Sequence, residues 1–184
     1  MQLHDIMQSN AVDVFITLLD ECSQFIGLSG GQPMRKFLPE TYNDIHRVKV
    51  RKKQRRDQFS SAFNEAFDEE IHQIRQRAIF ANGTQEAETD QESFLIFPPD
   101  GFKFLYCAEV SNSSRQYRSV FESILDVDDG DTFKELLKFA YTSENLAEGL
   151  EANAEIIIYN VPYFYAVRES VHSYEDVLSS IGEK

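Results

Sequence analysis

Residues 155–168 read EIIIYNVPYFYAVR, two apolar runs on either side of Pro162. Runs rich in Ile, Tyr, Phe and Val are typical of strands, and the second run alternates with a period of two. Because proline cannot donate a hydrogen bond to a sheet, Pro162 is expected at a turn or on an edge. The segment therefore predicts a hairpin. The residues expected on its core faces are Ile156, Ile158, Tyr163, Tyr165 and Val167.

Two further stretches predict strands. Pro98-Pro99-Asp100-Gly101 is a strong turn signal, and the apolar residues around it predict a hairpin with strands at 94–97 and 102–110. Over residues 45–51, valines alternate with cations, which predicts a half-buried strand with its charges in water.

Apolar residues recur at helical spacing in the intervening segments. The clearest stripe predicts a helix over 58–80 and consists of Phe59, Phe63, Phe67, Ile71 and Ile74. Other helices are predicted over 10–26, 113–124, 132–140, 143–150 and 173–183, with Thr132 and Glu135 forming a capping box. Helices and strands interleave without βαβ regularity, so we predict an α+β fold with a mainly antiparallel sheet of local hairpins.

The length of 184 residues suits a single domain that spans 1–184, with the acidic segment 84–93 as a flexible connector or loop within it. Cys22 and Cys107 lie in apolar runs without metal-ligand spacing, so we expect both to be reduced and buried. Neither a membrane span nor a secretion signal is recognisable. We expect an intracellular protein, in a host cytoplasm or as part of a virion.

Residues 46–56 read HRVKVRKKQRR, the one strongly basic stretch of a chain with a net charge of −13. This basic run holds seven of the eighteen Lys and Arg residues. They are Arg47, Lys49, Arg51, Lys52, Lys53, Arg55 and Arg56. We predict that these seven residues bind a partner.

Three interpretations of the basic run stay open. Cations on a strand face can neutralise phosphates, but the acidic field of the whole chain repels nucleic acid, and no aromatic residue is interleaved to stack on bases. The run can also dock an acidic protein surface, including that of another copy of the chain, or be a solvated patch. We favour docking to protein, with nucleic acid as the second choice.

No motif predicts a cofactor, a metal ion or a catalytic residue. Residues 69–72 and 169–172 each contain Glu-x-x-His, the spacing used by di-iron bundles, but the further helices that such sites need are lacking, so we interpret both as coincidence. No Ser stands in Gly-x-Ser-x-Gly, and no phosphate-binding loop is recognisable. We therefore predict that the protein is not an enzyme.

NAEIIIYNVPYFYAV resembles the catalytic hairpin of ADP-ribosyltransferases, in which a Glu opens an apolar strand before a turn that contains Pro. The resemblance implies Glu155 as the catalytic acid. The family has Gln or Glu two positions earlier, where this chain has Asn153, and its upstream Ser-Thr-Ser strand has no counterpart at the right distance. A degenerate ADP-ribosyltransferase-like enzyme is thus our last alternative.

KFAYTSENLAEGLEANAEIIIYNVPYFYAVRES, with its many Asn, Tyr and Glu residues, resembles late or accessory proteins of tailed bacteriophages. The resemblance implies a virion part, such as a head–tail connector or tail-completion subunit, or a small host-takeover factor. We accordingly expect a non-enzymatic subunit of a phage-like assembly, which docks copies of itself and other subunits through the basic run and acidic surfaces. The alternative is an effector that binds a host protein or nucleic acid through residues 46–56.

Overall fold

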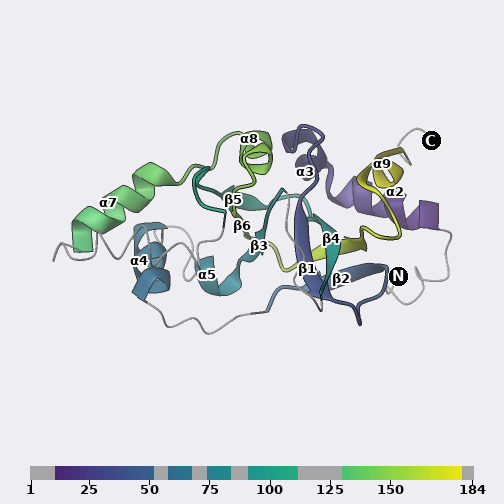
Figure 1. Ribbon diagram of the computed structural model, residues 1–184, viewed down its shortest axis with the longest axis horizontal. Helices are drawn as coiled ribbons and strands as arrows, with labels where there is room; N and C mark the ends of the chain where they lie inside the picture. The colour runs from purple at the N-terminus through teal and green to yellow at the C-terminus, as the bar shows by residue number, and fades with distance from the viewer. Residues whose placement is uncertain (1–10, 52–57, 68–73, 84–90, 112–129, 180–184) are drawn as a thin grey trace.

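The computed structural model describes residues 11–51, 58–67, 74–83, 91–111 and 130–179, and confirms an α+β fold with antiparallel sheets (Figure 1). Sheet A has the strand order β1-β4-β7-β2, and sheet B the order β3-β6-β5. The strands are β1 (Arg35–Pro39), β2 (Ile45–Lys49), β3 (Ile79–Ala81), β4 (Gln91–Phe97), β5 (Lys103–Leu105), β6 (Ile156–Tyr159) and β7 (Tyr163–Arg168). The helices are α2 (Ala11–Glu21), α3 (Ser23–Leu28), α4 (Gln58–Phe67), α5 (Ile74–Arg77), α7 (Gly130–Ala140), α8 (Leu146–Glu151) and α9 (Tyr174–Ser179).

The two predicted hairpins are wrong, because in each of them the two strands belong to different sheets. β4 pairs with β7 in sheet A, and β5 pairs with β6 in sheet B. Phe97 is opposite Tyr165 at the end of β4, and Lys103 is opposite Tyr159 at the start of β5. Lys103 follows Phe97 by six residues, and Tyr159 precedes Tyr165 by six residues. The register is therefore unbroken, and the two sheets share one bent antiparallel ribbon whose strands run through residues 91–105 and 156–168.

Contacts that are distant in sequence hold the bend of this ribbon. The carboxylate of Asp100 accepts hydrogen bonds from Ser23 Oγ and from the backbone N–H of Gln24, at 2.7 and 2.8 Å. Asn160 has a positive φ of 65° and donates from Nδ2 to the carbonyl of Gly101 at 2.9 Å. The turn residues at 98–101 and 160–162 thus bind helix α3 and each other, so the chain crosses between sheets at both places.

Sheet B is buried on both faces. From β6, Ile156 and Ile158 contribute to one hydrophobic cluster, while Ile157 and Tyr159 contribute to another. The first cluster continues through sheet A to α2, α3 and α9, and the second contains Phe63 of α4 and Leu137 of α7. Because successive residues of a strand point to opposite faces, an all-apolar strand fits this position between two cores.

One face of sheet A lies under helices α2, α3 and α9, which gather at one end of the molecule (Figure 1). Phe97 packs edge-to-face on Phe25 of α3 and stacks on Tyr174 of α9, with ring centroids 5.8 and 5.9 Å apart. Cys22 is buried at the junction of α2 and α3, and Cys107 is buried in the second cluster. Burial raises the pKa of both thiols.

Several predicted boundaries differ from the structure. Within the segment predicted as one helix over 58–80, α4 and α5 are helical and residues 68–73 lie outside the described residues, whereas Ile79 to Ala81 form strand β3, which pairs with β6. Strand β1 was not predicted, and α7 begins at Gly130, before the expected cap Thr132. Residues 91–93 of the expected connector belong to β4, whereas 84–90 and the helix predicted over 113–124 lie outside the described residues. Among the described helices, none is long and apolar enough to cross a membrane.

Candidate functional site: a basic groove beside an edge strand

Strand β2 carries the first part of the basic run, and it lies at an edge of sheet A. It pairs with β7, with Arg47 opposite Tyr165 and Lys49 opposite Tyr163. Val50 N–H donates to the carbonyl of Pro162, and Arg168 N–H donates to the carbonyl of Asp44. The backbone groups of the even-numbered residues in this segment therefore point toward β7. Because an antiparallel ladder alternates, the backbone N–H and C=O groups of Arg47 and Lys49 point out of the sheet.

The opposite edge of sheet A, strand β1, is closed. Arg35 exchanges two backbone hydrogen bonds with Asn82, at 2.7 and 3.0 Å, and thereby links β1 to the segment that follows β3. Pro39 ends the strand and has no N–H to offer. No backbone partner is found for the outward groups of Arg47 and Lys49 within the described residues, so β2 is the open edge of sheet A in this part of the chain.

The side chain of Arg47 lies on an aromatic ring. Its guanidinium carbon is 3.6 Å from the ring centroid of Tyr163, whose hydroxyl donates to Glu21 Oε2 at 3.0 Å. Tyr165 donates to the same carboxylate oxygen. Burial and the hydrogen bond to Glu21 raise the pKa of Tyr163, so both phenols stay protonated at neutral pH. Helix α2 thus holds Tyr163 in place, and Tyr163 orients Arg47.

A groove of about 250 Å³ opens on the other face of sheet A. Its lining residues come from β1, the loop after it, β2, β7 and β3, and they are Lys36, Leu38, Tyr42, His46, Val48, Lys49, Val50, Arg51, Ala78, Ile79, Phe80 and Phe164. The apolar members supply most of its wall. Among the described residues that line it, the polar side chains other than Tyr42 are three cations and one histidine, and none is a carboxylate.

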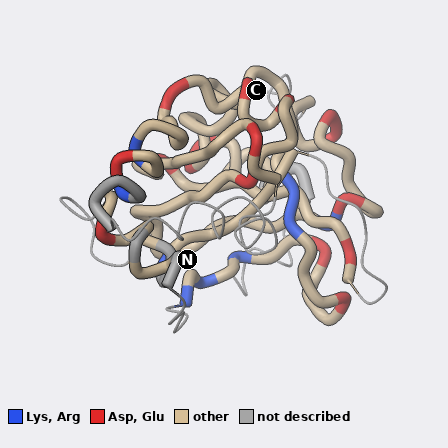
Figure 2. The backbone as a smooth tube through the Cα atoms, turned by 60° about the vertical axis from the view of Figure 1, so that its left-hand side comes forward, with Lys and Arg blue, Asp and Glu red and all other residues tan. Residues whose placement is uncertain are grey.

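Among the described residues, the charged side chains that line the groove are all cations. Lys36 Nζ donates to the carbonyl of Phe80 at 2.6 Å, which places its ammonium between β1 and β3. Lys49 and Arg51 are exposed at the end of β2, and burial lowers the pKa of His46 below its usual range. Figure 2 shows basic positions together along the lower margin of the molecule. The groove therefore favours a ligand that carries negative charge and an apolar group.

Arg168 holds the loop that forms one end of the groove. Its guanidinium pairs with Asp44 at 2.9 Å and with Glu92, and it donates to the carbonyls of Glu40 and Tyr42. Tyr42 packs edge-to-face on His46, with ring centroids 4.9 Å apart. The loop at this end of the groove is thus held in place by Arg168 and by packing on His46.

The predicted partner-binding residues divide into two groups. Arg47, Lys49 and Arg51 are exposed, while the alternating Val48 and Val50 are half-buried, as the pattern predicted. The strand itself is shorter than expected and ends at Lys49. The four remaining cations, Lys52, Lys53, Arg55 and Arg56, lie outside the described residues.

Several residues of the site were missed from the sequence. Lys36 belongs to a strand that the pattern did not predict, and Phe80 was assigned to a helix.

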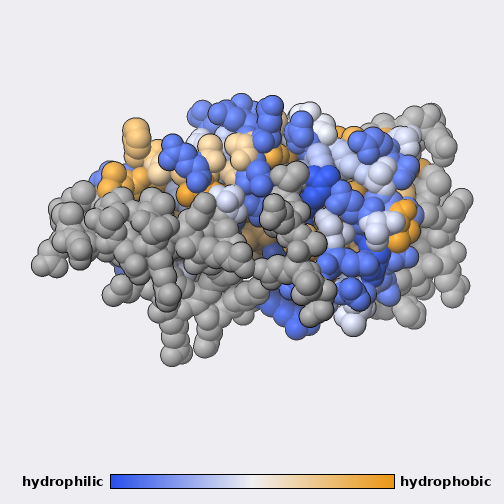
Figure 3. Space-filling view, viewed as in Figure 1, coloured by the Kyte–Doolittle hydropathy of each residue, from blue (hydrophilic) through white to orange (hydrophobic). Residues whose placement is uncertain are grey.

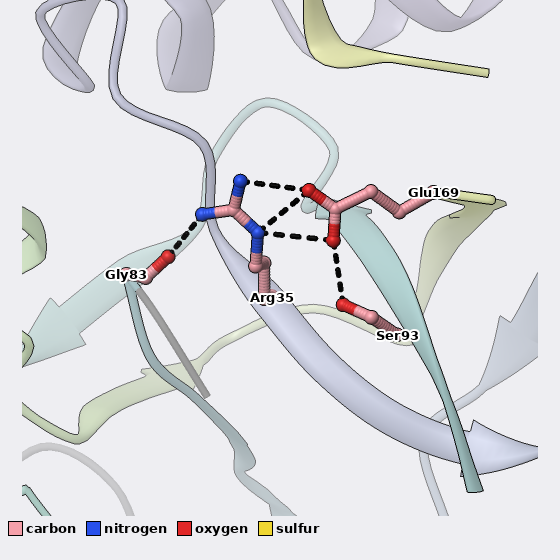
Figure 4. Close-up of polar contacts among 4 residues, drawn as sticks. All are labelled: Arg35, Gly83, Ser93 and Glu169. Carbon is pink, nitrogen blue, oxygen red and sulfur yellow. Dashed lines mark hydrogen bonds and ion pairs between the residues drawn. The ribbon is translucent and has the colours of Figure 1, made fainter. Parts of the chain in front are cut away.

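An ion pair outside the groove, between Arg35 and Glu169, was missed as well. The Arg35 guanidinium binds both oxygens of Glu169, at 2.7 to 3.0 Å, and the carbonyl of Gly83 (Figure 4). Its members are far apart in sequence, so no local signal marks them.

The ion pair of Arg35 and Glu169 connects several elements of the fold. Ser93 Oγ donates to Glu169 Oε2 at 2.7 Å, on the face of sheet A that α2 and α9 cover. Burial alone would raise the pKa of Glu169, but the hydrogen bonds from Arg35 and Ser93 outweigh it and lower the pKa. At Gly83 a Cβ would lie 1.9 Å from the carbonyl oxygen of Leu150, so only glycine fits there. The pair therefore joins β1, β4 and the end of β7 to the segment after β3.

Two other candidates can be placed. Glu155, the acid implied by the ADP-ribosyltransferase resemblance, is buried just before β6, and its N–H donates to the carbonyl of Val110 at 2.7 Å. The hairpin on which that resemblance depends is absent, since β6 and β7 lie in different sheets. His172, from the second Glu-x-x-His, packs on Phe15, and the described residues contain no cluster of His, Cys, Asp and Glu side chains able to hold a metal ion.

Comparisons with protein-family models, curated proteins and solved structures give no match.

Proposed function

We propose that this protein is a non-enzymatic interaction protein that docks an acidic protein partner through the basic groove and the exposed cations of β2. One observation carries the proposal. In a chain with a net charge of −13, the described residues that line an apolar groove include three cations and no carboxylate. Such segregation repels a partner of the wrong sign and orients one of the right sign.

Charge complementarity sets the expected behaviour of this contact. Cations at the rim of an interface contribute more to orientation and association rate than to affinity, and salt screens their effect. A contact to an acidic partner should therefore weaken as salt rises. The apolar wall of the groove adds a salt-independent part, since burial of apolar surface does not depend on screening.

Two assays test the proposal together. Light scattering gives the native mass of the wild-type protein and of R47E/K49E/R51E, and fluorescence anisotropy gives binding to labelled poly-glutamate. We expect the triple substitution to abolish binding to poly-glutamate, and to abolish self-assembly if the partner is another copy. The control K103E/K134E/K138E changes the net charge equally, away from the groove, and should bind as the wild type does.

Nucleic acid is the alternative partner, and the same variants discriminate it. Filter binding is measured with random-sequence duplex and single-stranded DNA, at low and moderate salt. We expect the wild type and the triple variant to give the same result. Tight binding that falls steeply with salt, together with no affinity for poly-glutamate, would replace an acidic protein by nucleic acid as the partner. The subunit of a phage-like assembly is our expectation for the biological setting, and it is not needed for this test.

A further inference from the structure

Strand β2 offers a second means of recognition beside its charge. Its outward backbone groups belong to Arg47 and Lys49, the same two residues whose exposed side chains are cationic. An open edge of this kind can pair with an extended segment of another chain. Lys and Arg on an edge also discourage pairing with neutral or basic strands, so the charge selects which segment can add.

The faces of β2 define the side chains of such a segment. Residues directly opposite each other in an antiparallel pair share a face. Opposite Arg47 and Lys49, the added residues would lie on the face with those two cations, where carboxylates are favoured. Opposite His46 and Val48, they would lie on the face of the groove, whose wall contains Leu38, Val48 and Phe164.

We infer that the ligand of this site is an extended segment in which acidic and apolar residues alternate, added as a further strand at the edge of β2. The inference rests on the proposed function and specifies its mode of binding. The acidic residues pair with Arg47 and Lys49 in both backbone and side chain, and the apolar residues enter the groove. The 250 Å³ of the groove is enough for one or two aliphatic side chains, whose burial favours binding.

Short synthetic peptides test this inference. The first alternates Val and Glu, and a second has the same composition with its Glu residues in one block. Two further versions of the alternating peptide carry N-methyl groups. In one, the Glu residues are methylated, and their N–H groups would face β2. In the other, the Val residues are methylated, and their N–H groups would face away from β2. We expect the alternating peptide to bind at least about tenfold more tightly than the block peptide, and only the methylation at Glu to cost a similar factor, since two hydrogen bonds are lost.

Amide hydrogen exchange gives a readout that charge alone would not move. The alternating peptide should protect the amides of Arg47 and Lys49, while those of His46 and Val48 are protected before it is added. The variant R47Q/K49Q/R51Q should bind more weakly, and K103Q/K134Q/K138Q should bind as the wild type does.

Each outcome decides one claim. Equal affinity for the alternating and block peptides, with no effect of either methylation, would overturn strand addition and leave acidic docking intact. Failure of all these peptides and of poly-glutamate to bind would overturn the proposed function itself. Self-association that the alternating peptide dissolves would show that the occupant is a strand of a second copy, and would overturn the choice of a separate partner.

Discussion

Strands β6 and β2 have almost the same length and opposite surroundings. β6 reads IIIY, lies between two other strands and is buried on both faces. β2 reads IHRVK, has one strand as its neighbour and alternates half-buried with exposed side chains. The difference teaches that sheet B joins two cores at one half of the bent ribbon, whereas sheet A, at the other half, has β2 as an outer strand with exposed side chains. The proposed contact surface is therefore separate from the main sources of stability, and substitutions should affect the two separately.

The largest loss of stability is expected from Phe63→Ala, beside the fully buried half. Phe63 is inaccessible to solvent and packs edge-to-face on Tyr141, with ring centroids 5.0 Å apart. Removing a buried phenyl ring leaves a cavity, which should lower the free energy of unfolding by about 3–5 kcal/mol. Urea denaturation measures it, and a loss under about 1 kcal/mol would show that α4 does not face a core.

Ile158→Ala should have the next largest effect, and Val48→Ala is its matched control. The first truncates a buried side chain in β6 and should cost about 2–5 kcal/mol. The second truncates a half-buried side chain in β2 and should cost only about 1 kcal/mol. Equal losses in urea denaturation would mean that the two strands are equally buried, which would contradict the contrast between β6 and β2.

A smaller effect, dependent on pH, is expected from Glu169→Gln. The lowered pKa of Glu169 means that the unfolded chain binds its proton more tightly than the folded one. The carboxylate therefore stabilises the fold above its ordinary pKa of 4.5, and this contribution disappears as pH falls through the lower, folded value. Since the pair with Arg35 is partly exposed, we expect a loss of about 1 kcal/mol at pH 7.

Thermal denaturation from pH 7 down to pH 2 compares the Gln variant with the wild type. The two melting temperatures should converge in acid. A difference that stays constant over this range would show that the carboxylate charge has no part in the stabilisation.

The smallest effect on stability is expected from R47Q/K49Q/R51Q at the edge of β2. Exposed charges contribute little to folding, so the free energy of unfolding should change by less than about 0.5 kcal/mol. Urea denaturation of this variant, set beside its weakened peptide binding, would separate function from stability. A loss above about 2 kcal/mol would instead assign the three cations to the fold.

The residue patterns of β2 and β6 could be predicted from the sequence, but the strands beside them could not. The all-apolar β6 and the alternation in β2 follow directly from which faces are buried. Turn residues look the same whether the chain reverses or crosses to another sheet. Here the choice depends on Asp100 binding helix α3 and on Asn160 binding Gly101, contacts between residues 59 to 77 positions apart.

The groove shows the same limit. The cations on β2 could be predicted, because they alternate with valines within one segment. Lys36 lies in β1, whose sequence RKFLP does not alternate regularly, and Phe80 lies in β3, which has only three residues. The bridge between Arg35 and Asn82 brings these strands together. A site made of side chains from β1, β2, β3 and β7 has no signature in any one of them.

Figure 3 shows hydrophobic side chains on a different part of the surface, at the end where α7 lies. Phe139 is 92% exposed, and Leu136 is 39% exposed. Unlike the groove, α7 has lysines that pair with carboxylates, Lys134 with Glu65 and Lys138 with Glu135, so its charges indicate no partner. The comparison between β6 and β2 therefore remains the basis for the proposed function.

The most direct test of the account is the exchange of backbone amide hydrogens in the free protein, followed by NMR. In β6 the amides of Ile157 and Ile158, which lie between β3 and β5, should all exchange slowly. In β2 the amides of His46 and Val48 should exchange slowly, and those of Arg47 and Lys49 rapidly. Slow exchange at Arg47 and Lys49, equal to that of their neighbours, would show that the edge of β2 is already paired and would contradict the account.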